Sequence, residues 1–101
     1  MAISPVTKST NQNGAVEYHL EFDSAWDGID SFVKYLSKHW AGDVSESADS
    51  IYSRRWVVRS RGVPISIYHD SQLGNYFLRE DGVSDLTLLE EIAADLMERM
   101  K

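Results

Sequence analysis

His69 and Asp70 are the neighbours in this chain that most resemble an acid–base pair, within the stretch ISIYHDSQLGNYFLRED at 65–81. A general base must lie within hydrogen-bond reach of the groups that orient it. Adjacent residues of a strand, however, point to opposite faces of the sheet. Asp70, Gly74 and Asn75 are also residue types that turns favour, because Asp and Asn bond their own backbone and Gly tolerates positive φ. The stretch is therefore predicted to be a turn between two strands, at the rim of a binding face, and not a catalytic site.

Other patterns that would indicate catalysis or metal binding are absent from the sequence. The three histidines, His19, His39 and His69, fall on separate predicted elements, with no HxH or HExxH spacing. There is no cysteine, which excludes a thiolate nucleophile, a thiolate zinc site and a disulfide. No serine lies in a GxSxG elbow, and the glycines form no phosphate-binding loop. The sequence predicts that the protein is not an enzyme and holds neither a cofactor nor a metal.

One predicted hairpin interleaves arginines with aromatic residues: Tyr52, Arg54, Arg55, Trp56, Arg59 and Arg61. Such a mixture can bind single-stranded nucleic acid by stacking and phosphate contact. Strand alternation divides the set, however, because Arg54 shares a face with Trp56 whereas Arg55 and Arg59 share the other. The second face is predicted to be solvated, with Arg55, Arg59 and Arg79 partly paired to Glu17 and Glu21. Binding of a small ligand or a nucleic acid through the Arg54–Arg61 hairpin remains an alternative.

Charge is segregated along the chain, whose net charge is −6. Residues 1–50 carry −5, residues 51–79 carry +4 and residues 80–101 carry −5. An acidic surface attracts basic proteins by long-range steering and repels phosphate backbones. The predicted partner-binding surface comprises the C-terminal acids with two tyrosines as apolar anchors: Glu80, Asp81, Asp85, Glu91, Asp95, Glu98, Tyr68 and Tyr76.

The elements that would position these residues follow from hydrophobic periodicity. Strict alternation predicts strands at 16–22, 51–60, 63–69 and 75–80, and residues 43–50 are predicted to be an edge strand or a loop. Tyr52, Trp56 and Val58 are expected on the apolar face of the strand at 51–60. Apolar residues at helical spacing predict helices near 24–40 and 84–99, the second capped by Ser84.

These elements predict an α+β fold, a two-layer sandwich of four to five antiparallel strands with two helices on one face. Residues 15–101 are expected to form a single domain, preceded by a segment at 1–14 that is flexible or an edge strand. The N-terminal residues do not resemble a secretory signal, and no apolar run is long enough for a membrane span. The expectation is a cytoplasmic protein that does not enter membranes.

The element order, the size and the acidic charge resemble those of small bacterial immunity proteins, which bind and block toxin domains. The spacing of AWDGIDSFVKYL, RRWVVRSRGVPISIYHD and NYFL also resembles a small uncharacterised proteobacterial domain family, which implies no activity. The first resemblance implies a protein that binds and neutralises a basic toxin domain. The alternative is a housekeeping protein-interaction domain.

Overall fold

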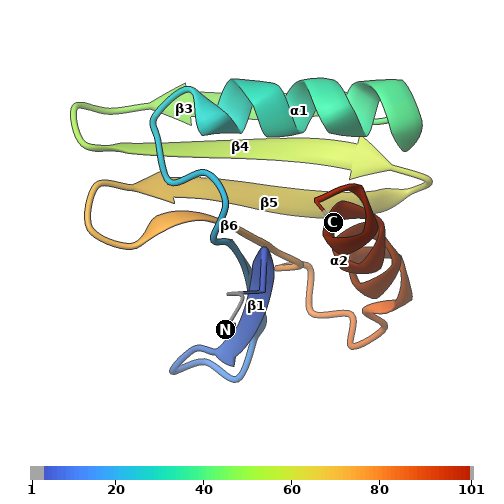
Figure 1. The fold of residues 1–101 in the computed structure, drawn as a ribbon. Helices are drawn as coiled ribbons and strands as arrows, with labels where there is room; N and C mark the ends of the chain where they lie inside the picture. The colour runs from blue at the N-terminus through green and yellow to red at the C-terminus, as the bar shows by residue number, and fades with distance from the viewer. Residues whose placement is uncertain (1–3, 101) are drawn as a thin grey trace.

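The computed structural model describes residues 4–100, so residues 1–3 of the predicted N-terminal segment and residue 101 lie outside the described residues. A six-stranded antiparallel sheet carries two helices on the same face, which confirms the α+β class (Figure 1). The elements in chain order are β1 (Val6–Thr10), β2 (Val16–Leu20), α1 (Gly28–His39), β3 (Asp43–Asp49), β4 (Ser53–Ser60), β5 (Val63–Asp70), β6 (Gly74–Leu78) and α2 (Thr87–Arg99).

The strands lie in the order β1-β2-β6-β5-β4-β3, and each neighbouring pair is antiparallel. Helix α1 carries the chain from β2 to the far edge at β3, and the three strands after it return towards β2 as a meander. The sheet closes where β6 pairs with β2, with Tyr18 opposite Phe77. The predicted meander within 51–80 is therefore confirmed.

The prediction of four to five strands is wrong, because both optional segments form strands. Asn11 stabilises the turn before β2, since its side-chain oxygen accepts hydrogen bonds from the backbone N–H groups of Asn13 and Ala15. This turn pairs β1 with β2. Strand β3 is exposed along its whole length, so its sequence, DVSESAD, has no apolar alternation to mark it. Its pairing with β4 rests on backbone hydrogen bonds and on side-chain pairs such as Asp49 with Arg54 and Glu46 with Arg55, not on burial of apolar residues.

The core lies between the helices and the covered face of the sheet. Its fully buried residues include Ile29 and Leu36 of α1, Leu89 and Ile92 of α2, and Phe77 of β6. Both helices contribute to one continuous cluster, which confirms that they pack against the same face.

Both helices begin later than the periodicity predicts, at Gly28 and Thr87. Before α1, the amide of Asn75 donates hydrogen bonds to the carbonyl oxygens of Asp23 and Ala25, 2.9 Å each, and holds residues 23–27 as a loop. Before α2, the carboxylate of Asp85 accepts hydrogen bonds from the N–H and hydroxyl of Thr87. Ser84 is therefore not the cap of the second helix.

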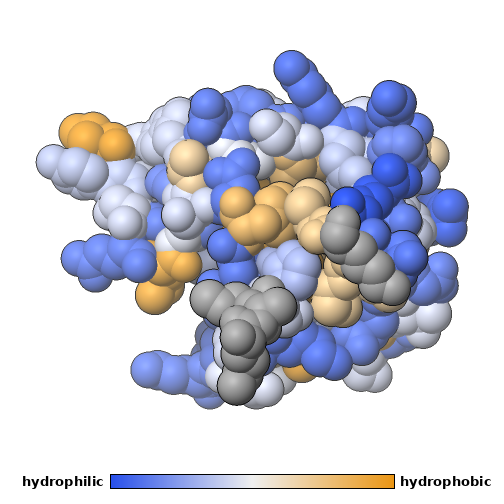
Figure 2. Space-filling model, viewed as in Figure 1, coloured by the Kyte–Doolittle hydropathy of each residue, from blue (hydrophilic) through white to orange (hydrophobic). Residues whose placement is uncertain are grey.

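The other face of the sheet is covered by neither helix. Alternation places Arg55, Val57 and Arg59 of β4 on this uncovered face, together with Ser66 and Tyr68 of β5. In Figure 2 orange groups stand out over the hairpin ends at the left, and an orange and tan patch also lies at the middle of the view. Neither helix covers the other face of the sheet or the hairpin ends.

Candidate functional site

A row of ring and guanidinium groups crosses the uncovered face at right angles to the strands. His19 lies opposite Tyr76, Tyr76 opposite Tyr68, and Tyr68 opposite Arg55 in the register of four neighbouring strands. The tyrosine rings stack with their centroids 5.3 Å apart and their planes at 12°. The ring of His19 is 5.1 Å from that of Tyr76, and the guanidinium carbon of Arg55 lies 5.8 Å from the ring of Tyr68. Strand alternation thus builds a continuous aromatic–cationic row.

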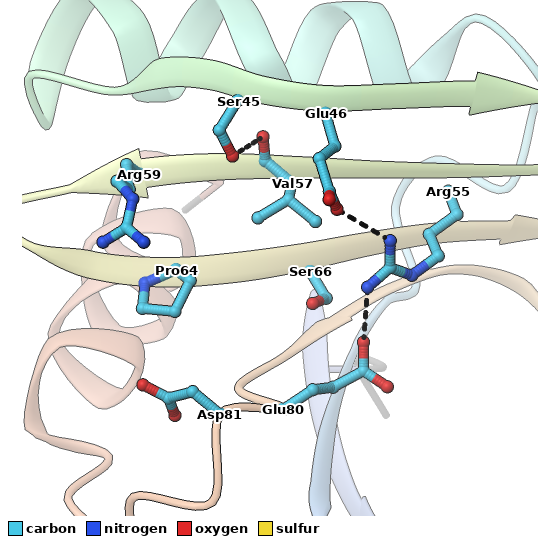
Figure 3. A pocket seen from close by; sticks show the side chains of 9 residues that line it. All are labelled: Ser45, Glu46, Arg55, Val57, Arg59, Pro64, Ser66, Glu80 and Asp81. Carbon is cyan, nitrogen blue, oxygen red and sulfur yellow. Dashed lines mark hydrogen bonds and ion pairs between the residues drawn. The ribbon is translucent and has the colours of Figure 1, made fainter.

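A shallow slot of about 380 Å³ lies beside this row and opens broadly to solvent (Figure 3). Val57, Pro64 and Ser66 form its floor. Arg55 and Arg59 stand on the β4 side, whereas Glu80 and Asp81 approach from the segment after β6. The slot therefore has a largely apolar floor between basic and acidic walls.

Tyr68, Arg55 and Glu80 form a hydrogen-bonded cluster between the row and the slot. The Tyr68 hydroxyl donates to the Glu80 carboxylate at 2.7 Å and accepts from Arg55 Nε at 3.0 Å. Arg55 also pairs with Glu46 at 3.0 Å and with Glu80 at 3.6 Å. The predicted pairing of the arginines with Glu17 and Glu21 is wrong, because β2 is separated from β4 by two strands and Arg79 pairs with Asp81.

Burial raises the pKa of Tyr68, and the neighbouring Glu80 carboxylate raises it further. The pKa of Tyr76 rises to about 12, first because of burial and then because of the negative charge of Glu17. Both hydroxyls therefore keep their protons at neutral pH and remain hydrogen-bond donors. The carboxylates of the uncovered face and its rim outnumber its arginines, with Glu17, Glu46, Asp70, Glu80 and Asp81 against Arg55, Arg59 and Arg79.

The structure divides the predicted partner-binding surface between two layers. Tyr68, Tyr76, Glu80 and Asp81 meet at the uncovered face. The remaining residues, Asp85, Glu91, Asp95 and Glu98, lie on α2 or just before it, on the other side of the sheet.

Two of these remaining acids stabilise the fold. The carboxylate of Asp85 accepts hydrogen bonds at the start of α2, and that of Asp95 accepts them from Tyr35 and Arg99. Both charges are therefore already engaged within the chain, whereas Glu91 is exposed on α2. The acids of the uncovered face are also engaged, since Glu46 and Glu80 pair with Arg55 and Asp81 pairs with Arg79, so the stacked tyrosines are what distinguishes that face.

His69 and Asp70 do not form an acid–base pair, as the turn interpretation expects. His69 is buried on the covered face, where its Nδ1 lies 2.7 Å from the side-chain oxygen of Asn75. Asp70 lies on the opposite face, and its carboxylate accepts hydrogen bonds from the backbone N–H groups of Gln72 and Leu73. Both side chains therefore stabilise the β5–β6 hairpin.

The arginines of the β4–β5 hairpin do not form one basic surface. Arg54 is 5% exposed and lies between the rings of Trp26 and Trp56, with its guanidinium carbon 4.9 Å and 5.1 Å from their centroids. It pairs with Asp30 at 2.8 Å and Asp49 at 2.9 Å. Arg61 instead covers the ring of Trp40, and Arg59 has no ion-pair partner among residues 4–100. The hairpin residues that the ligand-binding alternative would use together are thus distributed over three environments.

The sequence interpretation missed the apolar residues at the hairpin tips. Tyr52 was expected on the apolar face of a strand, but it precedes β4 and is 72% exposed. Its neighbour Ile51 is 83% exposed, and Leu73 in the β5–β6 turn is 63% exposed. Their positions could have identified them, because Leu73 lies between turn-forming residues and Ile51 follows a serine-rich segment.

Within residues 4–100, no group of three or more His, Asp or Glu side chains is placed to hold a metal ion. Neither helix of that described part has the length and apolar character needed to cross a membrane. Comparison with known proteins finds no matching family model, curated protein or solved structure.

Proposed function

We propose that the chain is a non-enzymatic protein-binding module that binds a basic protein through the uncovered face of its sheet. The observation that carries the proposal is the meeting of Tyr68, Tyr76, Glu80 and Asp81 on one face that no helix covers. Stacked tyrosines are frequent interface anchors, because they bury a large area and lose few rotamers. The surrounding carboxylates favour a basic partner.

A basic toxin domain is the form of partner that the resemblance to immunity proteins implies. An inhibitor of such a toxin gains from a rapid encounter, and an acidic face accelerates encounter with a basic domain by electrostatic steering. The excess of carboxylates on the uncovered face supports this role. The same excess weakens the nucleic-acid alternative, since Arg54 is buried and Arg55 is already paired with carboxylates.

The experiment begins with a partner captured from lysate of the source organism on the tagged protein and identified by mass spectrometry. Association and dissociation rates are then measured at low and high salt. Glu46→Lys changes an exposed charge of the uncovered face, and Glu91→Lys makes the same change on α2. Because rim charges act mainly on association, Glu46→Lys should slow association about tenfold at low salt, and Glu91→Lys much less.

Tyr76→Ala tests the anchor, because the truncation removes one ring of the stacked pair without breaking an ion pair. Loss of such an anchor should accelerate dissociation by about tenfold or more, with association little changed. The proposal is rejected if the captured partner is acidic, or if Glu91→Lys slows association more than Glu46→Lys does. An unchanged dissociation rate of the folded Tyr76→Ala variant would also reject it.

A further inference from the structure

Two hairpin turns lie side by side at one end of the sheet. The last cross-strand row that spans four strands at this end joins Asp49, Arg54, His69 and Asn75, and one shorter row of Ser53, Asp70 and Gly74 follows it. The turns at 50–52 and 71–73 lie immediately beyond this row, at the left of Figure 1. The loop at 23–27 joins them, because its carbonyl groups accept the hydrogen bonds of Asn75.

Large apolar side chains project from this end into solvent. Ile51, Tyr52 and Leu73 are 83%, 72% and 63% exposed, and Trp26 of the neighbouring loop is 40% exposed. The orange groups over the two hairpin ends in Figure 2 show the same feature. None of the three tip residues belongs to the core, and turns do not need their residue types. Each forgoes the stabilisation that burial of such a side chain contributes to a fold.

Both turns are held in place by hydrogen bonds. In the first, the Ser50 N–H donates to the Ser53 carbonyl at 2.8 Å, and the two hydroxyls lie 2.8 Å apart. In the second, the Asp70 carboxylate accepts hydrogen bonds from Gln72 and Leu73 at 2.8 Å and 3.1 Å. A partner therefore meets preorganised tips, so binding loses little entropy to loop ordering.

The charge around the tips has one sign. Five aspartates lie in the loop, at the start of α1 and in the last rows of the strands: Asp23, Asp27, Asp30, Asp49 and Asp70. Arg54 is the basic residue of the four-strand row, and it is buried and neutralised by Asp30 and Asp49. Anionic lipid would be repelled from such a rim, and a second copy would present the same carboxylates.

We propose that this hairpin end, defined by Ile51, Tyr52 and Leu73, is a second protein-binding surface. Its occupant is an apolar groove on a partner protein, flanked by Lys or Arg residues that face the aspartates. The hairpin end goes beyond the proposed function, because its apolar anchors include none of the residues assigned to the uncovered face, and Asp70 is the one carboxylate that borders both surfaces. Exposed apolar anchors within a charged rim have the arrangement of an interface hot spot.

The probe is a phage-displayed library of random peptides of about 12 residues, selected against the full chain. The enriched peptides should combine apolar residues with Lys or Arg. A synthetic peptide of the consensus sequence is then titrated into isotope-labelled protein. The largest amide chemical-shift changes should fall on residues 50–52 and 71–73, and the dissociation constant comes from the same titration.

Ile51→Ser and Leu73→Ser should each weaken peptide binding about tenfold, because each removes an anchor. Val83→Ser is the matched control, since Val83 is 46% exposed on a different loop, and it should change the affinity less than about twofold. All three positions are exposed, so the variants should keep the circular dichroism spectrum of the parent.

The proposal is overturned if no peptide is enriched, or if enriched peptides lack basic residues. Shift changes confined to Tyr68, Tyr76 and Glu80 would also overturn it while supporting the proposed function. Binding of the chain to phosphatidylglycerol vesicles, abolished by Ile51→Ser, would assign the hairpin end to a membrane instead. Concentration-dependent dimerisation abolished by Ile51→Ser would assign it to a second copy.

Discussion

Arg54 and Arg55 are consecutive in sequence but have opposite surroundings. The side chain of Arg54 is 4% exposed and pairs with Asp30 and Asp49, whereas that of Arg55 is 44% exposed on the uncovered face. Hydrogen bonding to Asp30 raises the pKa of Arg54, and in return lowers the pKa of that carboxyl. Alternation along β4 decides which arginine supports the fold and which one lies on the solvent-exposed face.

Arg54→Met should destabilise the protein by about 2–3 kcal/mol, measured by urea denaturation. The loss is smaller than the 3–5 kcal/mol typical of a broken buried pair, because Asp30 and Asp49 are each nearly half exposed and can be rehydrated. Arg55→Met is the matched control and should cost less than about 1 kcal/mol, as exposed ion pairs contribute little. Equal losses in the two variants would contradict the burial of Arg54.

Much of this residue-level arrangement is predictable from the sequence. Alternation pairs Arg54 with Trp56 on one face, and turn chemistry places Asp70 and Gly74 in a turn. The partners of Arg54 are not predictable, because Asp30 lies on a helix that becomes its neighbour only through tertiary packing. The sequence predicts Tyr68 and Tyr76 as anchors but not their stacking, which depends on the β5–β6 register.

At the scale of elements, the β5–β6 hairpin organises the loop that precedes α1. Asn75 donates to two carbonyls of that loop, and Gly74 lies against Ser24 of the same loop. Gly74 has φ +82°, and a Cβ built on it would lie 3.2 Å from Ser24 Cβ. Both the backbone conformation and the close approach therefore favour glycine here.

Gly74→Ala should be more destabilising than Gly14→Ala, although the two glycines have nearly equal φ values of +82° and +83°. No atom lies within 4 Å of a Cβ at Gly14, so that variant should lose only the backbone contribution, about 1–2 kcal/mol. The contact with Ser24 should add about 1 kcal/mol at Gly74. Thermal and urea unfolding measure the stability of both variants. An equal loss of stability would show that Ser24 moves away from the new Cβ without destabilising the protein.

At the scale of the molecule, the sequence predicts the α+β class and the helices on one face, because both depend on strong apolar periodicity. The two edge strands carry no such signal. In β3 every residue is exposed, so its strand character appears only through its pairing with β4. The exposed hairpin tips are equally difficult to predict, since a sequence does not reveal which apolar residues remain outside the core.

Several carboxyl groups have lowered pKa values because arginines donate hydrogen bonds to them, with Asp30 and Asp49 beside Arg54 as one pair. Their contribution to stability is fully present above the unfolded pKa, about 4. It is lost as the pH falls through the lower folded values. Urea midpoints should therefore stay high near neutrality and fall steeply below about pH 4.

Arg54→Met should make the urea midpoint fall less steeply at acid pH, because it removes the donor that lowers the pKa of both Asp30 and Asp49. Asp30→Asn should reduce this pH dependence only in part, since only one of the two titrating groups is lost. Urea midpoints of the three proteins across the same pH series measure the effect. A stability that rises as the pH falls below about 4 would contradict the assignment.

The pairing of β2 with β6 has a consequence for the synthesis of this protein. Tyr18 needs Phe77 opposite it, and the core that covers both needs Leu96 near the end of α2. At about 5–20 residues per second, a ribosome takes roughly 4–16 s to travel from Tyr18 to Leu96. Throughout that interval the apolar face of the β1–β2 hairpin has no cover. Folding therefore waits for the last helix to emerge, and the nascent chain depends on its acidic residues to resist aggregation meanwhile.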